Sequence, residues 1–109
     1  MSNPVKYEDT MIIPVKGPIT RRILANCPSL MAVEFTFSDV FTDTPHSHPH
    51  EQVSVVIEGV FQCNLDGELH LMNPGDSVVF LSNVPHCINC IKPGKLIDAF
   101  TPRREDFLK

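Results

Sequence analysis

Short apolar stretches recur along the chain, and clusters of glycine, proline, asparagine and aspartate separate them. Apolar and polar residues alternate over residues 33–37, and β-branched residues dominate residues 53–57. Both patterns are typical of strands. No stretch of ten residues shows a clear helical period away from proline or β-branched clusters, so the pattern predicts an all-β protein.

Further strands are expected between the turn signals of the second half. They cover residues 60–65, 68–72, 77–81, 87–91 and 96–100, with a turn expected at residues 92–95. Only the last residues, 104–108, are expected to form a helical turn. Six to nine short strands with hardly any helix predict a sandwich or a closed barrel.

Length and charge limit the classes of protein that fit. At 109 residues the chain suits one hydrophobic core, so a single domain over residues 1–109 is expected. A formal net charge of −4 disfavours a surface for nucleic acid or anionic membrane. No apolar stretch approaches the roughly 20 residues that span a bilayer, and the N-terminus lacks a secretion signal. A cytoplasmic protein is therefore expected.

The four cysteines are expected to be free thiols in a reducing cytosol. Cys87 and Cys90 are the one pair whose spacing suggests a disulfide or a shared metal ion. Three residues of separation on a strand places them on opposite faces, about 10 Å apart, which suits neither a disulfide nor one shared metal ion. A redox or zinc-knuckle role is the minor alternative to two buried or half-buried thiols.

Three of the five histidines lie close together, at His46, His48 and His50, just before the β-branched strand. His46 and His48 are two apart in an extended segment and so point to the same side, where both can bind one ion. His86 follows a later strand and completes a ligand set if the sheet closes on itself. The alternative is a polar surface loop with solvated histidines.

The spacing of these residues resembles the two motifs of the cupins, metal-binding barrels built as a double-stranded β-helix or jelly roll. The first motif runs from His46-Ser47-His48 through Gln52 to Gly59, and the second runs from Gly75 through His86 to Cys90. Four positions depart from the cupin pattern. They are Gln52 for Glu, Leu81 for Pro, Asn83 for Gly and Cys90 for Asn, of which Asn83 is the mildest because asparagine tolerates a positive φ. The resemblance covers residues 46–59 and 75–90 and implies a single-domain cupin barrel.

Gln52 changes the chemistry of the expected site. Imidazoles and a neutral amide oxygen would leave the full charge of a divalent ion available to polarise a substrate or water. The set also differs from the two-histidine, one-carboxylate site that prepares ferrous iron for oxygen. If Gln52 were a surface residue, three histidines and water would remain as ligands.

A closer resemblance rests on Arg22-Ile23-Leu24-Ala25, on residues 30–34, on residues 46–52 and on residues 96–108. These stretches look like the small cupins of the KdgF type, found in pectin and alginate degradation. The resemblance implies an enzyme that opens 4,5-unsaturated monouronates to linear keto sugars. It also implies one divalent ion, such as Ni, Zn, Fe or Mn, with the ligands His46, His48, Gln52 and His86.

The same resemblance assigns catalytic positions to Asp98, Phe100 and Arg104. Asp98 and Phe100 share one face of the last strand, so an inward-facing Asp98 could transfer a proton while Phe100 orients the sugar ring. Arg104 could grip the substrate carboxylate through two parallel hydrogen bonds. The structural alternatives are an ion pair of Asp98 with Lys95 or Arg103, a core role for Phe100, and a solvated turn around Arg104.

Other functions and partners remain open on the sequence alone. A cupin oxygenase and a non-catalytic cupin that binds a sugar acid are the two rival functions. The expected partner is a small unsaturated uronate, without nucleic acid or membrane, and a homodimer is expected through the apolar segment Met11-Ile12-Ile13 acting as an edge strand. The sequence does not choose between pectin and alginate, and it leaves the roles of His50, Cys87 and Cys90 open.

Overall fold

The computed structural model describes residues 3–109 and consists mainly of antiparallel strands, as the sequence pattern predicts. The strands are β1 (Ile13–Lys16), β2 (Ile19–Cys27), β3 (Leu30–Phe37), β4 (Glu51–Leu65), β5 (Glu68–Met72), β6 (Ser77–Phe80) and β7 (His86–Thr101). Two short 3-10 helices, η1 (Tyr7–Asp9) and η2 (Glu105–Leu108), complete the described elements. The helical turn expected near the C-terminus is therefore confirmed.

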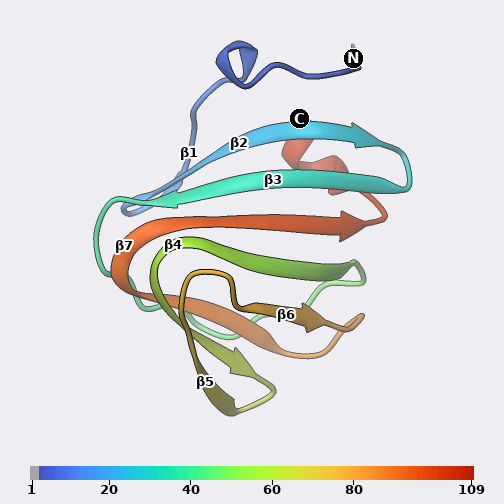
Figure 1. The fold of residues 1–109 in the computed structure, drawn as a ribbon. Coiled ribbons are helices and arrows are strands. Elements are labelled where there is room, and N and C mark those ends of the chain that lie inside the picture. The colour runs from blue at the N-terminus through green and yellow to red at the C-terminus, as the bar shows by residue number, and fades with distance from the viewer. Residues whose placement is uncertain (1–2) are drawn as a thin grey trace.

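The two longest strands, β4 and β7, build both layers of the barrel. The first part of β4 pairs with β6 and with the second part of β7, which also pairs with β3. The second part of β4 pairs with β5 and with the first part of β7. Figure 1 shows both strands curving from the upper layer into the lower one. A six-strand layer and a smaller layer thus share two continuous strands.

The bend depends on a close approach of two glycines. Register shifts on β4 fall between Val56 and Phe61, where the strand turns from one layer to the other. A Cβ atom on Gly59 would lie 2.5 Å from the backbone oxygen of Pro93, and one on Gly94 would lie 1.9 Å from that of Glu58. Gly59 also has a φ of +84°, which glycine adopts readily. The turn that the sequence predicts at residues 92–95 is wrong, because these residues belong to the bent strand β7.

The hairpin of β1 and β2 is absent from the sequence prediction, although it forms the end of the larger layer. Prolines at positions 14 and 18 and a glycine at 17 lie within or beside the two strands and hide the strand pattern. Two adjacent arginines, Arg21 and Arg22, further interrupt the alternation on β2. In the folded chain, Arg21 lies on the same face as Ile19, and Arg22 lies on the opposite face.

The hydrophobic core lies between the two layers. Its buried members are Ile19, Phe37, Val56, Phe61, Cys63, Met72, Phe80, Cys90 and Leu96. A smaller cluster of Met31, Val33 and Phe100 fills the other end, with Phe35 and Phe107 packed against it. Burying one such side chain stabilises the fold by about 1.5–3 kcal/mol, so the larger cluster holds the two layers together. No helix among residues 3–109 has the length and apolar character needed to cross a membrane.

Candidate active site

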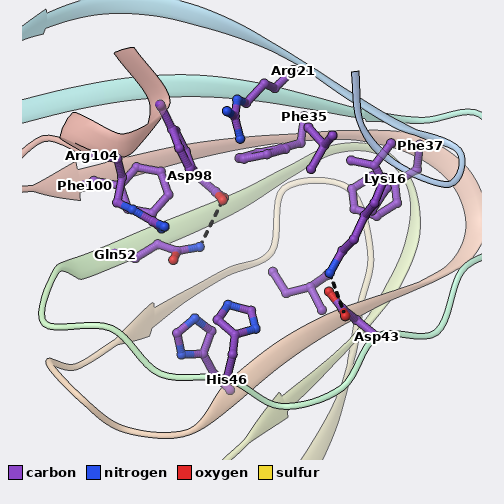
Figure 2. Close-up of a pocket in the computed structure, with 15 residues that line it drawn as sticks. Lys16, Arg21, Phe35, Phe37, Asp43, His46, Gln52, Asp98, Phe100 and Arg104 are labelled. Carbon is purple, nitrogen blue, oxygen red and sulfur yellow. Dashed lines mark hydrogen bonds and ion pairs between the residues drawn. The ribbon is translucent and has the colours of Figure 1, made fainter. Parts of the chain in front are cut away.

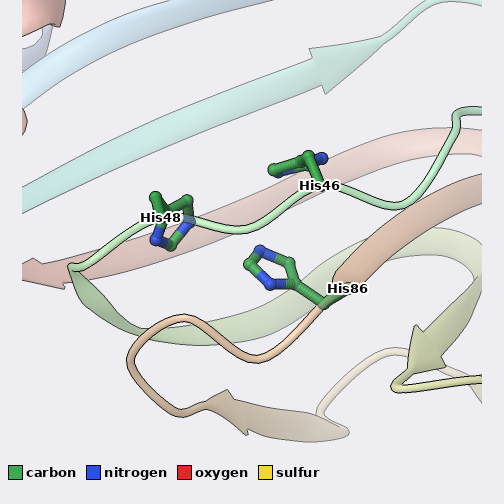
Figure 3. A group of neighbouring side chains, drawn as sticks. All are labelled: His46, His48 and His86. Carbon is green, nitrogen blue, oxygen red and sulfur yellow. The ribbon is translucent and has the colours of Figure 1, made fainter.

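Three histidines meet at the junction of the loop before β4 and the start of β7. His46 pairs with His86 through two backbone hydrogen bonds, of 2.9 Å from the amide of His46 and 2.8 Å from the amide of His86. His48 follows two residues after His46 and turns its ring toward the same side (Figure 3). One nitrogen from each of the three rings lies within 4.8 Å of the other two. The expected grouping of His46, His48 and His86 is therefore observed.

The tautomer of His86 leaves one nitrogen available to a ligand. Its Nδ1 lies 3.0 Å from the carbonyl oxygen of Val84, which only accepts a hydrogen bond, so Nδ1 carries the proton. Its Nε2 is buried and has no partner among the described residues. The ring stacks on Phe80 at 4.1 Å between centroids, which fixes its orientation. Burial lowers the pKa of His86 to about 4, so the ring is neutral at neutral pH.

The contact between His48 and Gln52 brings two metal-ligating atoms together. The Nδ1 atom of His48 donates to the backbone oxygen of His50 at 2.9 Å, which leaves a lone pair on its Nε2. The Gln52 amide nitrogen donates to Ser54 and Asp98, so the amide oxygen points at His48 Nε2, 3.1 Å away. In a ring protonated only on Nδ1, the lone pair of Nε2 faces the amide oxygen, an arrangement that suits a cation between the two atoms.

The donor set fits a divalent transition metal. Four possible ligand atoms lie close together: three imidazole nitrogens from His46, His48 and His86, and the amide oxygen of Gln52. The buried Nε2 of His86 has no hydrogen-bond partner among the described residues. Neutral imidazole suits zinc, nickel, copper and iron, and each ring here is held in place by a backbone contact or by stacking. Gln52 is 7% exposed, so the alternative of a surface glutamine is wrong.

Asp98 lies beside this group and is buried, with 4% of its surface exposed. Its Oδ2 accepts the hydrogen bond from Gln52 Nε2 at 2.9 Å, and its Oδ1 is buried without a partner among the described residues. Burial raises the pKa of Asp98 to about 7, although a hydrogen bond to Ser54 and the charge of Arg104 oppose the shift. Asp98 forms an ion pair with neither Lys95 nor Arg103, so this alternative to a role in the site is wrong.

Phe100 and Arg104 border the same space. Phe100 belongs to the smaller core cluster and also lines the cavity. The guanidinium carbon of Arg104 lies 5.2 Å from the centre of the Phe100 ring. Arg104 Nε and Nη2 donate to the two carboxylate oxygens of Asp106, at 3.1 and 3.0 Å. This pair occupies one edge of the Arg104 fork and leaves Nη1 outside it.

A cavity of about 290 Å³ joins these groups. It is lined by His46, Gln52, His86, Asp98, Phe100 and Arg104, whereas His48 stands outside the lining and faces the cluster from beside His86. Figure 2 shows His46 on one side of the space and Asp98 with Arg104 on the other. Small-molecule sites commonly measure about 300–1,000 Å³, so the cavity suits a ligand no larger than one sugar.

Several lining residues were not predicted from the sequence. Lys16 and Asp43 form an ion pair of 2.9 Å at one end of the cavity, and Arg21 and Phe107 contribute to its wall. Arg21 was missed because the strand that carries it was missed. The available signal was a charged residue in the apolar series Ile19, Arg21, Ile23, whose members share one face of β2.

The structure also places the residues whose roles the sequence leaves open. The backbone oxygen of His50 accepts the hydrogen bond of His48 Nδ1, so the main chain of His50 orients the His48 ring. Cys87 is next to His86 in the chain but lies outside the cluster of possible metal ligands among the described residues. Its Sγ contacts the Asp43 carbonyl oxygen at 3.8 Å. All four cysteines are free, and Cys63, Cys87 and Cys90 are buried.

The fold and the histidine site define a class. The family model described as "Cupin domain" matches residues 37–100. The chain therefore belongs to the cupin family. Within that family it is of the KdgF type, because it is 35% identical over 92 residues to the "Pectin degradation protein KdgF" of Dickeya dadantii (strain 3937). That match covers 83% of this chain and 84% of the relative.

Two solved structures are similar over nearly the whole chain. An RmlC-like cupin from Shewanella frigidimarina NCIMB 400 has a TM-score of 0.91 and 37% sequence identity, with 98% of this chain and 96% of that chain covered. KdgF from Halomonas sp. has a TM-score of 0.88 and 33% identity, with 98% and 99% covered. The similarity to KdgF therefore extends from the sequence to the arrangement of the strands.

Proposed function

We propose that this protein opens the ring of 4,5-unsaturated monouronates from pectin or alginate breakdown and yields linear keto sugars. The observation that carries the proposal is the buried carboxyl group of Asp98. It faces a cavity of monosaccharide size, its Oδ1 is unpartnered, and Gln52 links it to the histidine cluster. The similarity to the pectin degradation protein KdgF supports the class of substrate.

The reaction is an isomerisation in which protons and electrons balance. The anomeric hydroxyl loses its proton as the bond between C1 and the ring oxygen breaks, and C1 becomes an aldehyde. The electron pair of that bond stays on the former ring oxygen, which becomes the C5 carbonyl oxygen when the C4–C5 double bond takes up a proton at C4. One proton leaves and one is gained, so the reaction needs no oxidant, reductant or added water.

Asp98 is assigned the proton transfer. A carboxyl group that is 4% exposed is removed from bulk water, and its free Oδ1 can exchange a proton with a sugar in the cavity. Gln52 holds the other oxygen, Oδ2, and so keeps Oδ1 directed to the cavity. Positioned proton transfer of this kind contributes about 10²- to 10⁴-fold to a rate.

His46, His48, Gln52 and His86 would hold one divalent ion. When bound, the ion supplies positive charge that stabilises the negative charge developing on substrate oxygen. On the other side of the cavity, Arg104 binds the substrate carboxylate through the part of its fork that Asp106 leaves free. Phe100 supplies an apolar wall that orients the ring.

The test is a time course of the metal-loaded protein on the unsaturated monouronate, followed by loss of its conjugated ultraviolet absorbance. We expect a rapid loss of this absorbance, far above the spontaneous rate. The loss should stop with a chelator and return when metal is restored. Unchanged absorbance with metal-loaded protein would remove the assigned reaction. Oxygen consumption with the same substrate would instead favour the oxygenase, and tight binding without turnover would favour the binding protein.

A further inference from the structure

Arg21 lies in the cavity wall without a role in the reaction described above. It is on β2, in register with Phe35 of β3, and it shares its face with Ile19 and Ile23, which pack into the core clusters. A guanidinium group among such neighbours loses much of its hydration, and this loss is costly unless a partner compensates it. Figure 2 shows the Arg21 side chain reaching toward the space near Asp98 and Phe35.

The Nε atom of Arg21 has no such partner within the protein. It is buried and makes no hydrogen bond to any described residue. The unpartnered atoms Asp98 Oδ1 and His86 Nε2 belong to residues that line the same cavity. Buried polar groups are almost always hydrogen-bonded, so three exceptions around one space indicate that a polar ligand completes them.

Arg21 and Arg104 share one aromatic ring. Their guanidinium carbons lie 3.8 and 4.3 Å from the centre of Phe107. Asp106 accepts its two hydrogen bonds from Arg104, so Arg21 donates none to this carboxylate. Burial lowers the pKa of Arg21, the charge of Asp106 opposes this, and the charge of Arg104 adds to it. Two guanidinium groups and the carboxylate of Asp106 thus lie together at Phe107, in a partly dehydrated setting.

We propose that Arg21 is a second carboxylate-binding residue, which together with Arg104 forms a two-arginine clamp for the substrate's carboxylate. The proposal rests on the proposed function and extends it to a residue from a different strand. Asp106 takes two of the five N–H donors of Arg104, one on Nε and one on Nη2, so the three donors on Nη1 and Nη2 remain for the carboxylate. Arg21 supplies additional donors, including its unpartnered Nε, and the bound carboxylate lies beside both guanidinium groups.

The adjacent Arg22 provides a matched control. Its Nη1 donates to the backbone and side-chain oxygens of Thr10 at 3.0 Å, and its guanidinium stacks on Tyr7 at 4.6 Å. It lies on the opposite face of β2 and is not part of the cavity lining. Arg22→Gln therefore removes the same charge from the same strand without touching the clamp.

The probe is galacturonate, a saturated uronate that cannot undergo the reaction, compared with its uncharged methyl ester by calorimetric titration of metal-loaded protein. Arg21→Gln is expected to weaken galacturonate binding by about 10- to 100-fold, the loss typical of a hydrogen bond to a charged group. Binding of the methyl ester is expected to stay unchanged, and Arg22→Gln is expected to bind both as the wild type does. Arg21→Lys keeps the charge without the fork and should recover part of the affinity.

Equal galacturonate affinity in Arg21→Gln and wild type would overturn the clamp, and so would an equal loss for galacturonate and its ester. Kinetics separate the clamp from the reaction itself. Arg21→Gln is expected to raise KM for the unsaturated uronate with little change in kcat, because Arg21 binds before and during the reaction. If the wild type turns over no unsaturated uronate but shows the galacturonate pattern, the reaction fails and the clamp stands.

Discussion

Gln52 Nε2 donates a 2.9 Å hydrogen bond to Asp98 Oδ2, and the oxygen of the same amide lies 3.1 Å from His48 Nε2. One neutral side chain thus connects the carboxyl group assigned to proton transfer with the histidine cluster. A carboxylate at this position could not donate to Asp98 and would add a second negative charge beside it. The amide at position 52 is therefore important to both halves of the site.

Gln52→Glu is expected to separate metal binding from activity. The added negative charge should tighten metal binding, whereas loss of the donor to Asp98 should lower kcat by at least about tenfold. Metal titration and steady-state kinetics measure the two effects. Gln62→Glu, the same change further along β4 where the side chain contacts Asn89, is the control. A Gln52→Glu enzyme as fast as the wild type would contradict the assigned link.

Asp98→Asn is expected to lower kcat by about 100-fold or more, since the amide cannot exchange the proton. The amide oxygen still accepts from Gln52, so metal content and melting temperature should not fall. Steady-state kinetics, metal analysis and thermal melting provide the readouts. Asp66→Asn, in the turn between β4 and β5, is the control, because asparagine tolerates the φ of +50° there. Full activity in Asp98→Asn would remove this residue from the reaction.

Metal removal is expected to destabilise the fold. Metal at 100 times its dissociation constant stabilises the native state by about 2.7 kcal/mol, which corresponds to a rise in Tm of roughly 10 °C or more for a domain near 100 residues. Thermal melts with metal and with chelator measure the shift. His86→Ala should abolish it, while His70→Ala, which removes only the contact of His70 Nε2 with Glu68 on β5, should keep it. An identical shift in both variants would place the metal elsewhere.

The four thiols are expected to differ sharply in reactivity at pH 8. Hydrogen bonds from Ser29 lower the pKa of the exposed Cys27, which increases its thiolate fraction at a given pH. Burial raises the pKa of Cys63 to about 11, and it also raises the pKa values of Cys87 and Cys90. Iodoacetamide followed by peptide mass mapping should label Cys27 first, and all four thiols should react after denaturation. Early labelling of Cys63 in the native protein would show that the core opens readily.

We further propose that the protein forms a homodimer through the edge at β1. Met11 and Ile12, just before this edge strand, are 76% and 59% exposed, which is unusual for two adjacent large apolar residues. Light scattering after size exclusion should give twice the 12.2 kDa of one chain, and Ile12→Glu should restore the single-chain mass. Leu69→Glu, at an exposed position on β5, should leave the dimer intact. A wild-type monomer would contradict the proposal.

The sequence predicts the site better than it predicts the strand ends. The alternation of His46 and His48 fixes their common side, and the barrel brings His86 to them through the backbone pairing of residues 46 and 86. The φ of +62° at Asn83 agrees with the expectation that asparagine replaces a cupin glycine there. These features depend on local backbone geometry, which can be predicted from the spacing of residues in the sequence.

The unpredicted features depend on contacts between distant segments. Pro93 and Gly94 indicate a turn locally, yet Gly59 approaches so closely that β7 continues through a bend. The place of Arg21 in the cavity wall depends on the packing of β2, β3 and the C-terminal turn. Its contact Phe107 is 86 positions away in the chain. The burial that raises the pKa of Asp98 likewise arises from packing of the whole barrel.

The most direct measurement of the proposed reaction is carbon NMR of labelled unsaturated monouronate during conversion by the metal-loaded protein. We expect loss of the C4–C5 double bond, a new CH₂ group at C4, a ketone at C5 and an aldehyde or its hydrate at C1, with no oxygen consumed. Asp98→Asn is expected to form this product at least about 100-fold more slowly. A substrate that keeps its ring and double bond, or one that gains an oxygen atom, would contradict the proposed reaction.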